Sequence, residues 1–417
     1  MKKSLVFLFV FFLSFSAVFS TNALASGYLL NEYSVTSLGR AFAGIGVVGD
    51  DLSAIASNPA GLQLFDRTVG AQVGATVITL NGKFNGDVTS ALGKQSGSAR
   101  VEIQEVVPNF FANYALNDRI KFGLGVYVPF GLGTTYSDNS IVQLSAIESQ
   151  LQVIEIAPSM SWNIWKGLSI GATVNIQHGA ATLTQSSPNP LNLLSGQLLY
   201  TKVQGDTWAV GGTVGLIYDF GETSGGDKTV VGLSYRSQVK HGLEGTMNVY
   251  PLLEKDVTAD MYLPNVVTLS AYHKFKAPVG LSATLRYIQW SIFDSLEIKG
   301  SGQPRIHQDW RDTFSAHVGV DWFVDPSITL RAGFAYDMTP IKDAEHRTAR
   351  IPDNDRFLLS FGLTAKPHES WQIDVGYTHL FLTKASINNT HSGLNINGEY
   401  SYDALSYLIG VQVQYKF

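Results

Sequence analysis

Apolar and polar side chains alternate with a period of two residues along most of the 417 residues of this chain. In residues 168–177 every second position carries Leu, Ile, Ala, Val and Ile, while the positions between them carry Ser, Gly, Thr, Asn and Gln. Residues 328–336 and 371–378 repeat this pattern. Because successive side chains of a β-strand point to opposite faces, each stretch predicts one strand with one apolar face.

About fourteen such stretches follow one another, so we expect an all-β chain. They are separated alternately by short turn-like pieces, such as 117–118, 165–167, 325–326 and 367–370, and by long polar stretches at 84–99, 131–148, 185–204 and 340–354. Short turns on one side and long loops on the other are typical of outer-membrane barrels. Residues 65–417 are therefore predicted to form a fourteen-stranded antiparallel transmembrane β-barrel.

The composition supports a lipid-facing wall. Hydrophobic residues make up 45% of the chain and aromatic residues 12%, yet beyond residue 25 no apolar run is long enough for a membrane-spanning helix. A soluble β-sandwich would have shorter strands and a polar exposed face. Trp310, Trp322 and Trp371 fall near predicted strand ends, where an aromatic girdle is expected.

The last predicted strand carries a targeting pattern. Ile409, Val411, Val413, Tyr415 and the terminal Phe417 share one face. A C-terminal aromatic residue on an alternating strand resembles the signal read by the outer-membrane assembly machinery, so this machinery is an expected partner through Phe417. A closed barrel also removes unpaired strand edges, which lipid does not tolerate.

The first 25 residues are predicted to be a signal peptide that is removed. Lys2 and Lys3 precede an apolar run over 5–18, and Ala23-Leu24-Ala25 supplies a small-residue cleavage pattern. The chain has no Cys, which excludes disulfides and thiolate metal sites. Acidic residues outnumber basic ones, 34 against 29, so we expect no nucleic-acid partner.

Residues 26–64 lack the alternation and are small and Gly-rich, with short helical periods. Asp50 and Asp51 stand in the first turn of one predicted helix, where the helix dipole favours acids, and Pro59 ends it. We interpret this region as a hatch, a small helical plug folded into the barrel lumen. Asn58, Pro59 and Ala60 are expected to form the turn that seats the hatch, and to be available for ligand contact.

Several blocks in order resemble the FadL family of long-chain fatty-acid transporters. These are Ser26-Gly27-Tyr28, Asn31-Glu32, Gly39-Arg40-Ala41, Asp50-Asp51, Asn58-Pro59-Ala60, Tyr235-Arg236-Ser237, Val239-Lys240, and the stretches 331–337 and 351–357. The resemblance covers essentially the whole chain after the signal peptide. It implies a fourteen-stranded barrel with a hatch in the outer membrane, and ligand-driven passage of a hydrophobic substrate with lateral exit into the membrane.

Three prolines, Pro108, Pro129 and Pro158, fall within successive predicted strands, and Gly131 follows the second. Because proline cannot donate a hydrogen bond to the sheet, each weakens local pairing. The three strands are a candidate lateral opening, and a kink in the third strand is also what the resemblance implies. The alternative is that these prolines occupy bulges with no role in transport.

A fatty acid needs a basic group above an apolar tunnel. His178 and Arg311 are candidate ligand-binding residues, since by local alignment they fall about where the resembled family uses basic residues. If the family residue is Arg, His178 departs from it, and a less polar substrate becomes plausible. The alternatives are an ordinary lumen hydrogen bond for His178 and an ion pair with Asp309 or Asp312 for Arg311.

Within the predicted loop 185–204, residues 191–200 are unusually apolar, and Leu193, Leu194, Leu198 and Leu199 are candidates for a capture surface. They would equally serve as the cover of a loop core. Gly44–Gly49 matches a dinucleotide-binding pattern, but no strand precedes it and no βαβ unit contains it.

We therefore expect passive uptake of long-chain fatty acids by a monomeric outer-membrane transporter, with aromatic or aliphatic hydrocarbons as the alternative cargo. No cofactor and no metal is expected. An enzyme is the second class of function, with His307 near Asp309, and His346 near Asp343 and Glu345, as the only clusters that invite comparison with a catalytic site. An open porin is the third class, disfavoured by the hatch.

Overall fold

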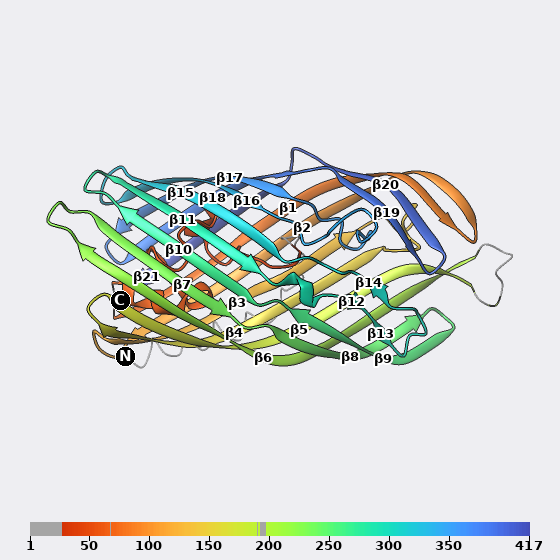
Figure 1. The fold of residues 1–417 in the computed structure, drawn as a ribbon, viewed down its shortest axis with the longest axis horizontal. Coiled ribbons are helices and arrows are strands. Elements are labelled where there is room, and N and C mark those ends of the chain that lie inside the picture. The colour runs from red at the N-terminus through yellow and green to blue at the C-terminus, as the bar shows by residue number, and fades with distance from the viewer. Residues whose placement is uncertain (1–26, 67, 190, 192–196) are drawn as a thin grey trace.

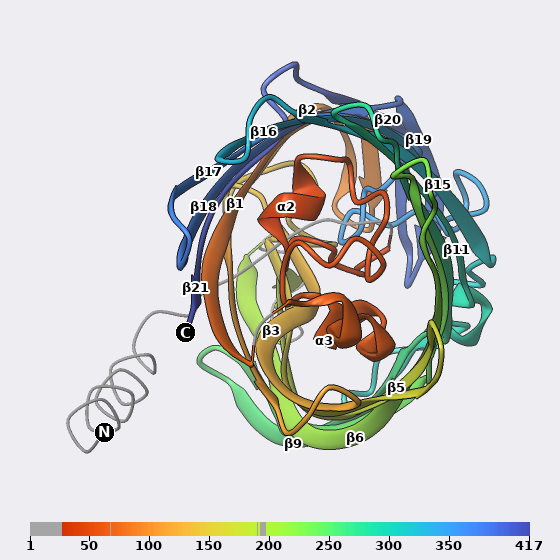
Figure 2. The same cartoon turned by 90° about the vertical axis from the view of Figure 1, so that its left-hand side faces the viewer.

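The computed structural model describes residues 27–417, apart from residues 67, 190 and 192–196. A closed antiparallel β-barrel surrounds the N-terminal segment, which we define as residues 27–65 (Figures 1 and 2). The predicted signal peptide lies outside the described residues. Among the residues that the structure describes, no helix is both long and apolar enough to cross a membrane.

The N-terminal segment contains two short α-helices and one 3-10 helix, and Figure 2 shows them inside the ring of strands. They are α2 (Val35–Leu38), α3 (Ala54–Ser57) and η2 (Pro59–Leu64).

The first half of the barrel wall is built from long neighbouring hairpins. Its strands are β1 (Val69–Ser90), β2 (Gly93–Ala115), β3 (Ile120–Thr135), β4 (Glu148–Trp165), β5 (Leu168–Pro188), β6 (Leu198–Glu222), β7 (Lys228–Arg236), β8 (Val239–Val249), β9 (Leu253–Leu263) and β10 (Val266–Lys274).

The second half contains shorter strands and longer connections. Its strands are β11 (Val279–Ile288), β13 (Ile298–Lys299), β15 (Thr313–Phe323), β16 (Ile328–Asp337), β17 (Arg356–His368), β18 (Trp371–Leu382), β19 (Ala385–His391), β20 (Leu394–Tyr402) and β21 (Tyr407–Lys416). The connection after β11 holds the 3-10 helix η4 (Trp290–Ile292) and a separate small hairpin, β12 (Ser295–Leu296) with β14 (Ile306–His307).

These strands form fourteen wall strands, because β7 and β8, β9 and β10, β11 and β13, β18 and β19, and β20 and β21 are consecutive pieces of interrupted strands. The ring closes where β1 pairs with β21, with Val73 opposite Val413. The predicted fold class, a fourteen-stranded antiparallel barrel, is confirmed. At each interruption, the pairing to a neighbouring strand changes.

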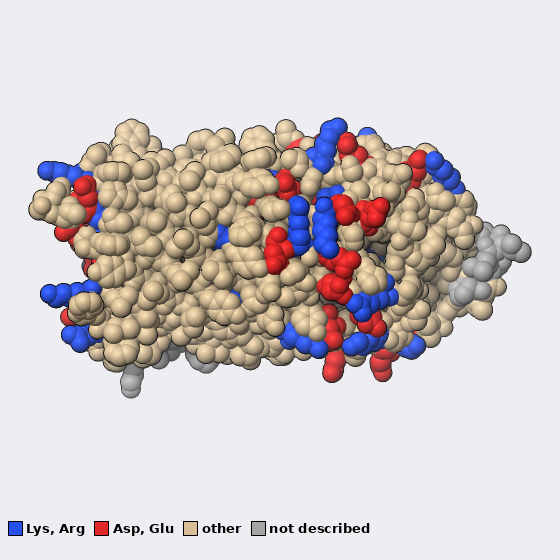
Figure 3. Space-filling model, in the orientation of Figure 1, with Lys and Arg blue, Asp and Glu red and all other residues tan. Residues whose placement is uncertain are grey.

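The wall reverses its polarity along its length. Near the start of β1, the buried inward side chains are the polar Gln72 and Thr76, whereas the apolar Val73 is exposed on the outside. Nearer the end of β1, at Ser90, the buried inward side chains are the apolar Phe84 and Val88. Figure 3 shows a broad uncharged zone next to a band of charged side chains. The uncharged zone has the polarity of a lipid-facing surface, and the part beyond the charged band has that of a water-facing one.

This reversal explains an error in the predicted loops. The stretch 84–99 was expected to be a polar loop, but β1 pairs with β2 without interruption from Val69 to Ser90. Likewise β5 extends to Pro188 and β6 begins at Leu198, inside the expected loop 185–204. These strand ends lie in water, so their outer faces are polar. Few apolar residues alternate there, and the sequence therefore reads as a loop.

The girdle prediction is consistent with Trp322 and Trp371, which are exposed on the outside. It is wrong for Trp310, which is buried inside the barrel because the chain enters the lumen before β15 begins. Phe417 follows β21 and is exposed on the same face as Ile409 and Val411. Its recognition by the assembly machinery stays a prediction.

Candidate functional site

The N-terminal segment is seated on the wall through Asn58. The Asn58 Oδ1 accepts a hydrogen bond from the Ala60 N–H (3.2 Å), and its Nδ2 donates to the Leu216 and Leu233 carbonyls (3.2 and 3.4 Å). Pro59 opens η2, where its missing N–H has no cost. A Cβ on Gly215 of β6 would overlap the Asn58 side chain, so this wall position accommodates the turn only as glycine.

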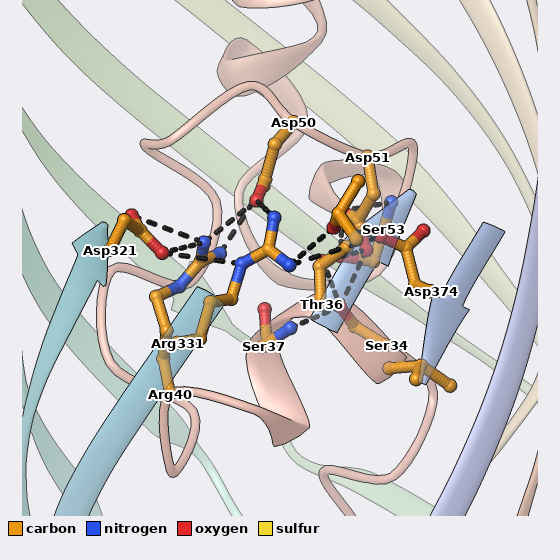
Figure 4. Close-up of polar contacts among 12 residues, drawn as sticks. Ser34, Thr36, Ser37, Arg40, Asp50, Asp51, Ser53, Asp321, Arg331 and Asp374 are labelled. Atoms are coloured by element: carbon orange, nitrogen blue, oxygen red, sulfur yellow. Dashed lines mark hydrogen bonds and ion pairs between the residues drawn. The ribbon is translucent and has the colours of Figure 1, made fainter. Parts of the chain in front are cut away.

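A buried ionic network ties the same segment to the opposite side of the barrel (Figure 4). The Arg40 guanidinium contacts Asp50 (2.7 Å) and Asp321 (3.1 Å), and Arg331 contacts the same two carboxylates at 3.2 Å each. Burial by itself would raise the pKa of Asp50, but Arg40 and Arg331 hold that pKa well below its usual value. The segment is therefore held by charges from β15 and β16.

Asp51 organises the turn between α2 and α3. Its carboxylate accepts hydrogen bonds from the hydroxyls of Ser34 (2.5 Å), Thr36 (2.8 Å) and Ser53 (2.5 Å). Burial raises the pKa of Asp51, and the neighbouring Asp50 raises it further. Asp51 thus fixes the internal fold of the segment, while Asp50 fixes its position in the barrel.

The beginning of the N-terminal segment belongs to a large apolar cluster inside the barrel. The Tyr28 ring contacts Trp290 (4.5 Å between ring centroids), Trp310 (5.6 Å) and Phe293 (5.9 Å). We call it the apolar lumen cluster; its buried members are Tyr28, Leu29, Leu80, Ile103, Phe130, Leu132, Leu151, Val153, Val239, Leu243, Met261, Leu263, Val266, Ile288, Trp290, Phe293, Trp310, Ile341 and Ile351. Such a surface suits the apolar body of a hydrophobic solute.

The wall is not fully paired next to this cluster. β2 and β3 pair at Asn109 and Tyr127 and again at Glu102 and Thr135, but their register has no pairs between these points. We call this the β2–β3 break. Instead of β2, the N-terminal segment contacts β3 there: the Leu30 N–H donates to the Pro129 carbonyl and the Gly131 N–H to the Tyr28 carbonyl, both at 2.9 Å.

The three prolines all lie at or next to irregular pairing. Pro129 falls in a register shift between β3 and β4, and Pro158 in a stretch of β4 that has no partner on β5. Pro108 pairs with Ala75 of β1 but has no partner on β3. Bulges and a weakened wall are thus both present, and Pro108, Pro129 and Gly131 border the β2–β3 break.

Two arginines that were not among the predicted ligand-binding residues, Arg236 and Arg286, line a small cavity of about 20 Å³, together with Leu29, Leu30, Tyr33 and Pro129. Arg236 forms an ion pair with Glu155. Arg286 is also buried, and it hydrogen-bonds to Asn31 and to Thr268 (3.5 Å). Within the described part of the chain, no Asp or Glu side chain forms an ion pair with Arg286.

The two predicted ligand-binding residues lie elsewhere. His178 was expected in the lumen, but it stands on the outer face of β5, where its Nε2 contacts Asp206 (3.1 Å) and its ring packs on Trp208. Arg311 is half-buried, and its Nε donates to the Thr339 carbonyl (3.3 Å) rather than to Asp309 or Asp312. Neither residue lines the cavity beside Arg286.

The predicted capture surface is only partly described. Leu193 and Leu194 lie outside the described residues. Leu199 is buried and Leu198 is half-buried, because both belong to β6 rather than to a loop. These two positions therefore present little free apolar surface.

The histidines weighed as a catalytic cluster lie around a water-facing cavity of about 450 Å³, which His307, His346, His391 and Glu345 line. His346 contacts Asp309 (3.3 Å) and Asp343 (2.8 Å). The described residues include no group of three or more His, Asp or Glu side chains placed to hold a metal ion.

The glycines of the dinucleotide-like pattern have another use. Gly44, Gly46 and Gly49 all adopt positive φ angles, between 70° and 78°, inside the N-terminal segment. They are glycines because the segment turns sharply there, not because a phosphate approaches.

Comparisons with known proteins agree with this architecture. A relative from Escherichia coli O6:H1, named long-chain fatty acid transport protein, is 27% identical over 444 residues, with 96% of each chain covered. The crystal structure of a Pseudomonas aeruginosa FadL homologue matches with a TM-score of 0.84 and 23% identity, covering 94% of this chain and all of that one.

The fold is also similar to the toluene transporter TbuX of Ralstonia pickettii, with a TM-score of 0.67 and 18% identity, covering 93% of this chain and 99% of that one. The model of one protein family matches residues 16–417, almost the whole chain. The chain therefore belongs to the family of outer membrane protein transport proteins described as OMPP1/FadL/TodX.

Proposed function

We propose that this protein carries long-chain fatty acids passively across the outer membrane, from the apolar lumen cluster to the lipid through the β2–β3 break. The main observation in support is that the apolar lumen cluster lies beside both the β2–β3 break and the buried Arg286, which has no carboxylate partner among the described residues. The name of the Escherichia coli relative supports the same cargo.

Arg286 is the proposed anchor for the carboxylate. A buried cation is costly unless an anion compensates it, and a fatty acid brings one negative charge on a long apolar chain. Arg236 is less suitable, because Glu155 already neutralises it. The apolar chain would then lie against Leu29 and Val266, which line the same cavity and belong to the apolar lumen cluster.

Passage requires the N-terminal segment to move. The cavity beside Arg286 has room for little more than a water molecule, and residues 28–30 lie along β3 at the β2–β3 break. Binding of cargo would displace these residues, while the Asn58 contacts and the Arg40–Asp321 ion pair keep the rest of the segment in place. The function needs no cofactor, metal or chemical step, and we propose no enzymatic activity.

Uptake of labelled oleate and labelled toluene by cells lacking their own transporter tests this function. We expect the wild type to take up oleate, and Arg286→Gln to lose most of that uptake while toluene uptake is unchanged. Arg311→Ala is the matched control, because that arginine lies away from the cavity, and it should behave as wild type. If the wild type takes up neither compound, the proposed function is wrong.

Uptake of hydrocarbons is the second candidate, supported by the same apolar cluster and by the names of fold neighbours such as the toluene transporter. Equal toluene and oleate uptake that is insensitive to Arg286→Gln would favour it. An open porin would instead give a large, steady conductance in planar bilayers. We expect only small conductance from a monomer, because the N-terminal segment fills the lumen.

A further inference from the structure

The wall has a second break of the same kind, between β6 and β8. β6 pairs with β7 as far as Thr213 and Arg236, and with β8 from Asp206 and Glu244 onward. Residues 207–211 of β6 and residues 239–243 of β8 have no register with one another, although each stretch stays paired to its other neighbour. At one end of this stretch the Ser237 N–H donates to the Gly212 carbonyl (2.9 Å). We call this the β6–β8 break.

The β6–β8 break lies where the outer surface changes from apolar to charged. Trp208 and Val210 of β6 are among the most exposed apolar side chains of the wall, at 62% and 65%. The neighbouring outward positions are the charged Asp206 on β6 and Lys240 on β8. A tryptophan next to charges marks the outer membrane interface, so the break faces the outer-leaflet lipid.

On its inner side the break meets the apolar lumen cluster. Val239 and Leu243 of β8 are buried members of that cluster, and Ala209 of β6 packs against it. The same cluster includes Ile103 and Phe130 beside the β2–β3 break. One continuous apolar body therefore extends through the lumen from one break to the other.

Only side chains close the β6–β8 break. A Cβ built on Gly211 of β6 would overlap Val239 Cγ2, and a Cβ on Gly179 of β5 would lie 2.7 Å from His241 Nδ1. Val239 and His241 thus fill the space that these glycines leave. Moving them needs rotation of two side chains and the loss of the buried hydrogen bond between His241 and Gln177 (2.9 Å). No hydrogen bond of the β-ladder has to break, so local opening costs less here than in the fully paired wall.

We infer that the β6–β8 break is a second lateral opening, through which a hydrophobic solute dissolved in the outer-leaflet lipid exchanges with the apolar lumen cluster. This inference rests on the proposed function, since it concerns the same cargo. The protein then has two lipid-facing routes to one internal site, the β2–β3 break and the β6–β8 break. Val239 and His241 close the second.

A cleavable cross-link tests it. In Val210→Cys with Lys240→Cys, two exposed outward positions flank the break, and a short bis-methanethiosulfonate reagent would join them. We expect oleate transfer between the bilayer of proteoliposomes and the protein to fall several-fold on cross-linking and to recover after reduction. The matched control is Leu269→Cys with Leu285→Cys, a directly paired, exposed position of β10 and β11, where the cross-link should change nothing.

A second readout does not depend on net transport. A diazirine-bearing fatty acid dissolved in the bilayer should label Val239 and Leu243 on illumination, and the cross-link should lower that labelling several-fold, because only the route through the β2–β3 break remains. Unchanged transfer and unchanged labelling in the cross-linked variant would overturn the second opening. If the wild type transfers no oleate yet is labelled at these positions, the second opening stands and the proposed function fails.

Discussion

The backbone N–H of Leu30 donates a 2.9 Å hydrogen bond to the carbonyl oxygen of Pro129, in the stretch of β3 that β2 leaves unpaired. The N-terminal segment thus serves as the neighbour of β3 along the β2–β3 break. Because the same residues border the apolar lumen cluster, a solute that displaces Leu30 also frees the edge of β3. In the proposed function, ligand binding and opening of the wall are coupled through this one short piece of chain.

Replacing Pro129 with Val should restore a backbone donor on β3 and reduce the irregularity there. We expect a folded barrel with much lower oleate uptake, because extended pairing narrows the β2–β3 break. Pro367→Val is the matched control, since Pro367 lies at another register shift, between β17 and β18, far from the break. Uptake that stays at the wild-type rate in Pro129→Val would exclude this proline from the route.

Arg331→Gln should destabilise the protein by about 3–5 kcal/mol, because it leaves the buried Asp321 and Asp50 with one guanidinium instead of two. The measurement is urea unfolding in detergent, followed by tryptophan fluorescence. Lys384→Gln removes an exposed ion pair with Glu399 and should cost no more than about 1 kcal/mol. Equal effects of the two variants would contradict the structural role of the network.

The lowered pKa of Asp50 predicts how acid affects the seating of the N-terminal segment. A carboxyl whose pKa is lower when folded contributes stability that is complete above its unfolded pKa, about 4, and is lost as the pH falls through the folded value. The Asp50 contribution should therefore persist to lower pH than that of an ordinary carboxylate. In Arg40→Gln the loss should begin at higher pH, as measured by thermal unfolding across a pH series; identical profiles would argue against the pairing.

Gly27 is packed directly against the aromatic residues of the lumen. Its φ is +65°, and an added Cβ would lie 2.7 Å from Trp290 and 2.9 Å from Trp310. Gly27→Ala should lose about 1–3 kcal/mol more stability than Gly302→Ala, which has a similar φ of +77° but open space around it. The difference in unfolding free energy between the two variants isolates packing from backbone strain, and no difference would place Gly27 outside the cluster.

Alternation predicts both the wall strands and the face of the wall on which each of their residues lies. It places residues 371–378 correctly on one wall strand, and its continuation past Ile176 places His178 on the outer face, where the structure has it. The same rule places Arg286 inside, because the outward positions of β11 are Leu281, Ala283 and Leu285. A basic residue at an inward position of a predicted strand was therefore the sequence feature that could have indicated Arg286 as the proposed carboxylate anchor.

Alternation does not specify how far along the barrel axis a residue lies. It also does not specify the register between segments that are distant in sequence. Arg40 meets Asp321 across 281 residues of sequence, and nothing local in either stretch specifies that contact. The β2–β3 break is a similar case: Pro129 marks a weak point, but the replacement of β2 by residues 28–30 depends on where the N-terminal segment comes to rest.

The most direct test of the account is to lock the N-terminal segment in place. Leu29 and Phe130 are bridge partners, so Leu29→Cys with Phe130→Cys should form a disulfide that holds residues 28–30 on β3. We predict that the oxidised variant, reconstituted in liposomes, transfers labelled oleate several-fold more slowly, because the β2–β3 break stays closed, and that reduction restores the rate. Oleate transfer at the same rate in the oxidised and reduced forms would show that residues 28–30 need not leave β3 for cargo to pass.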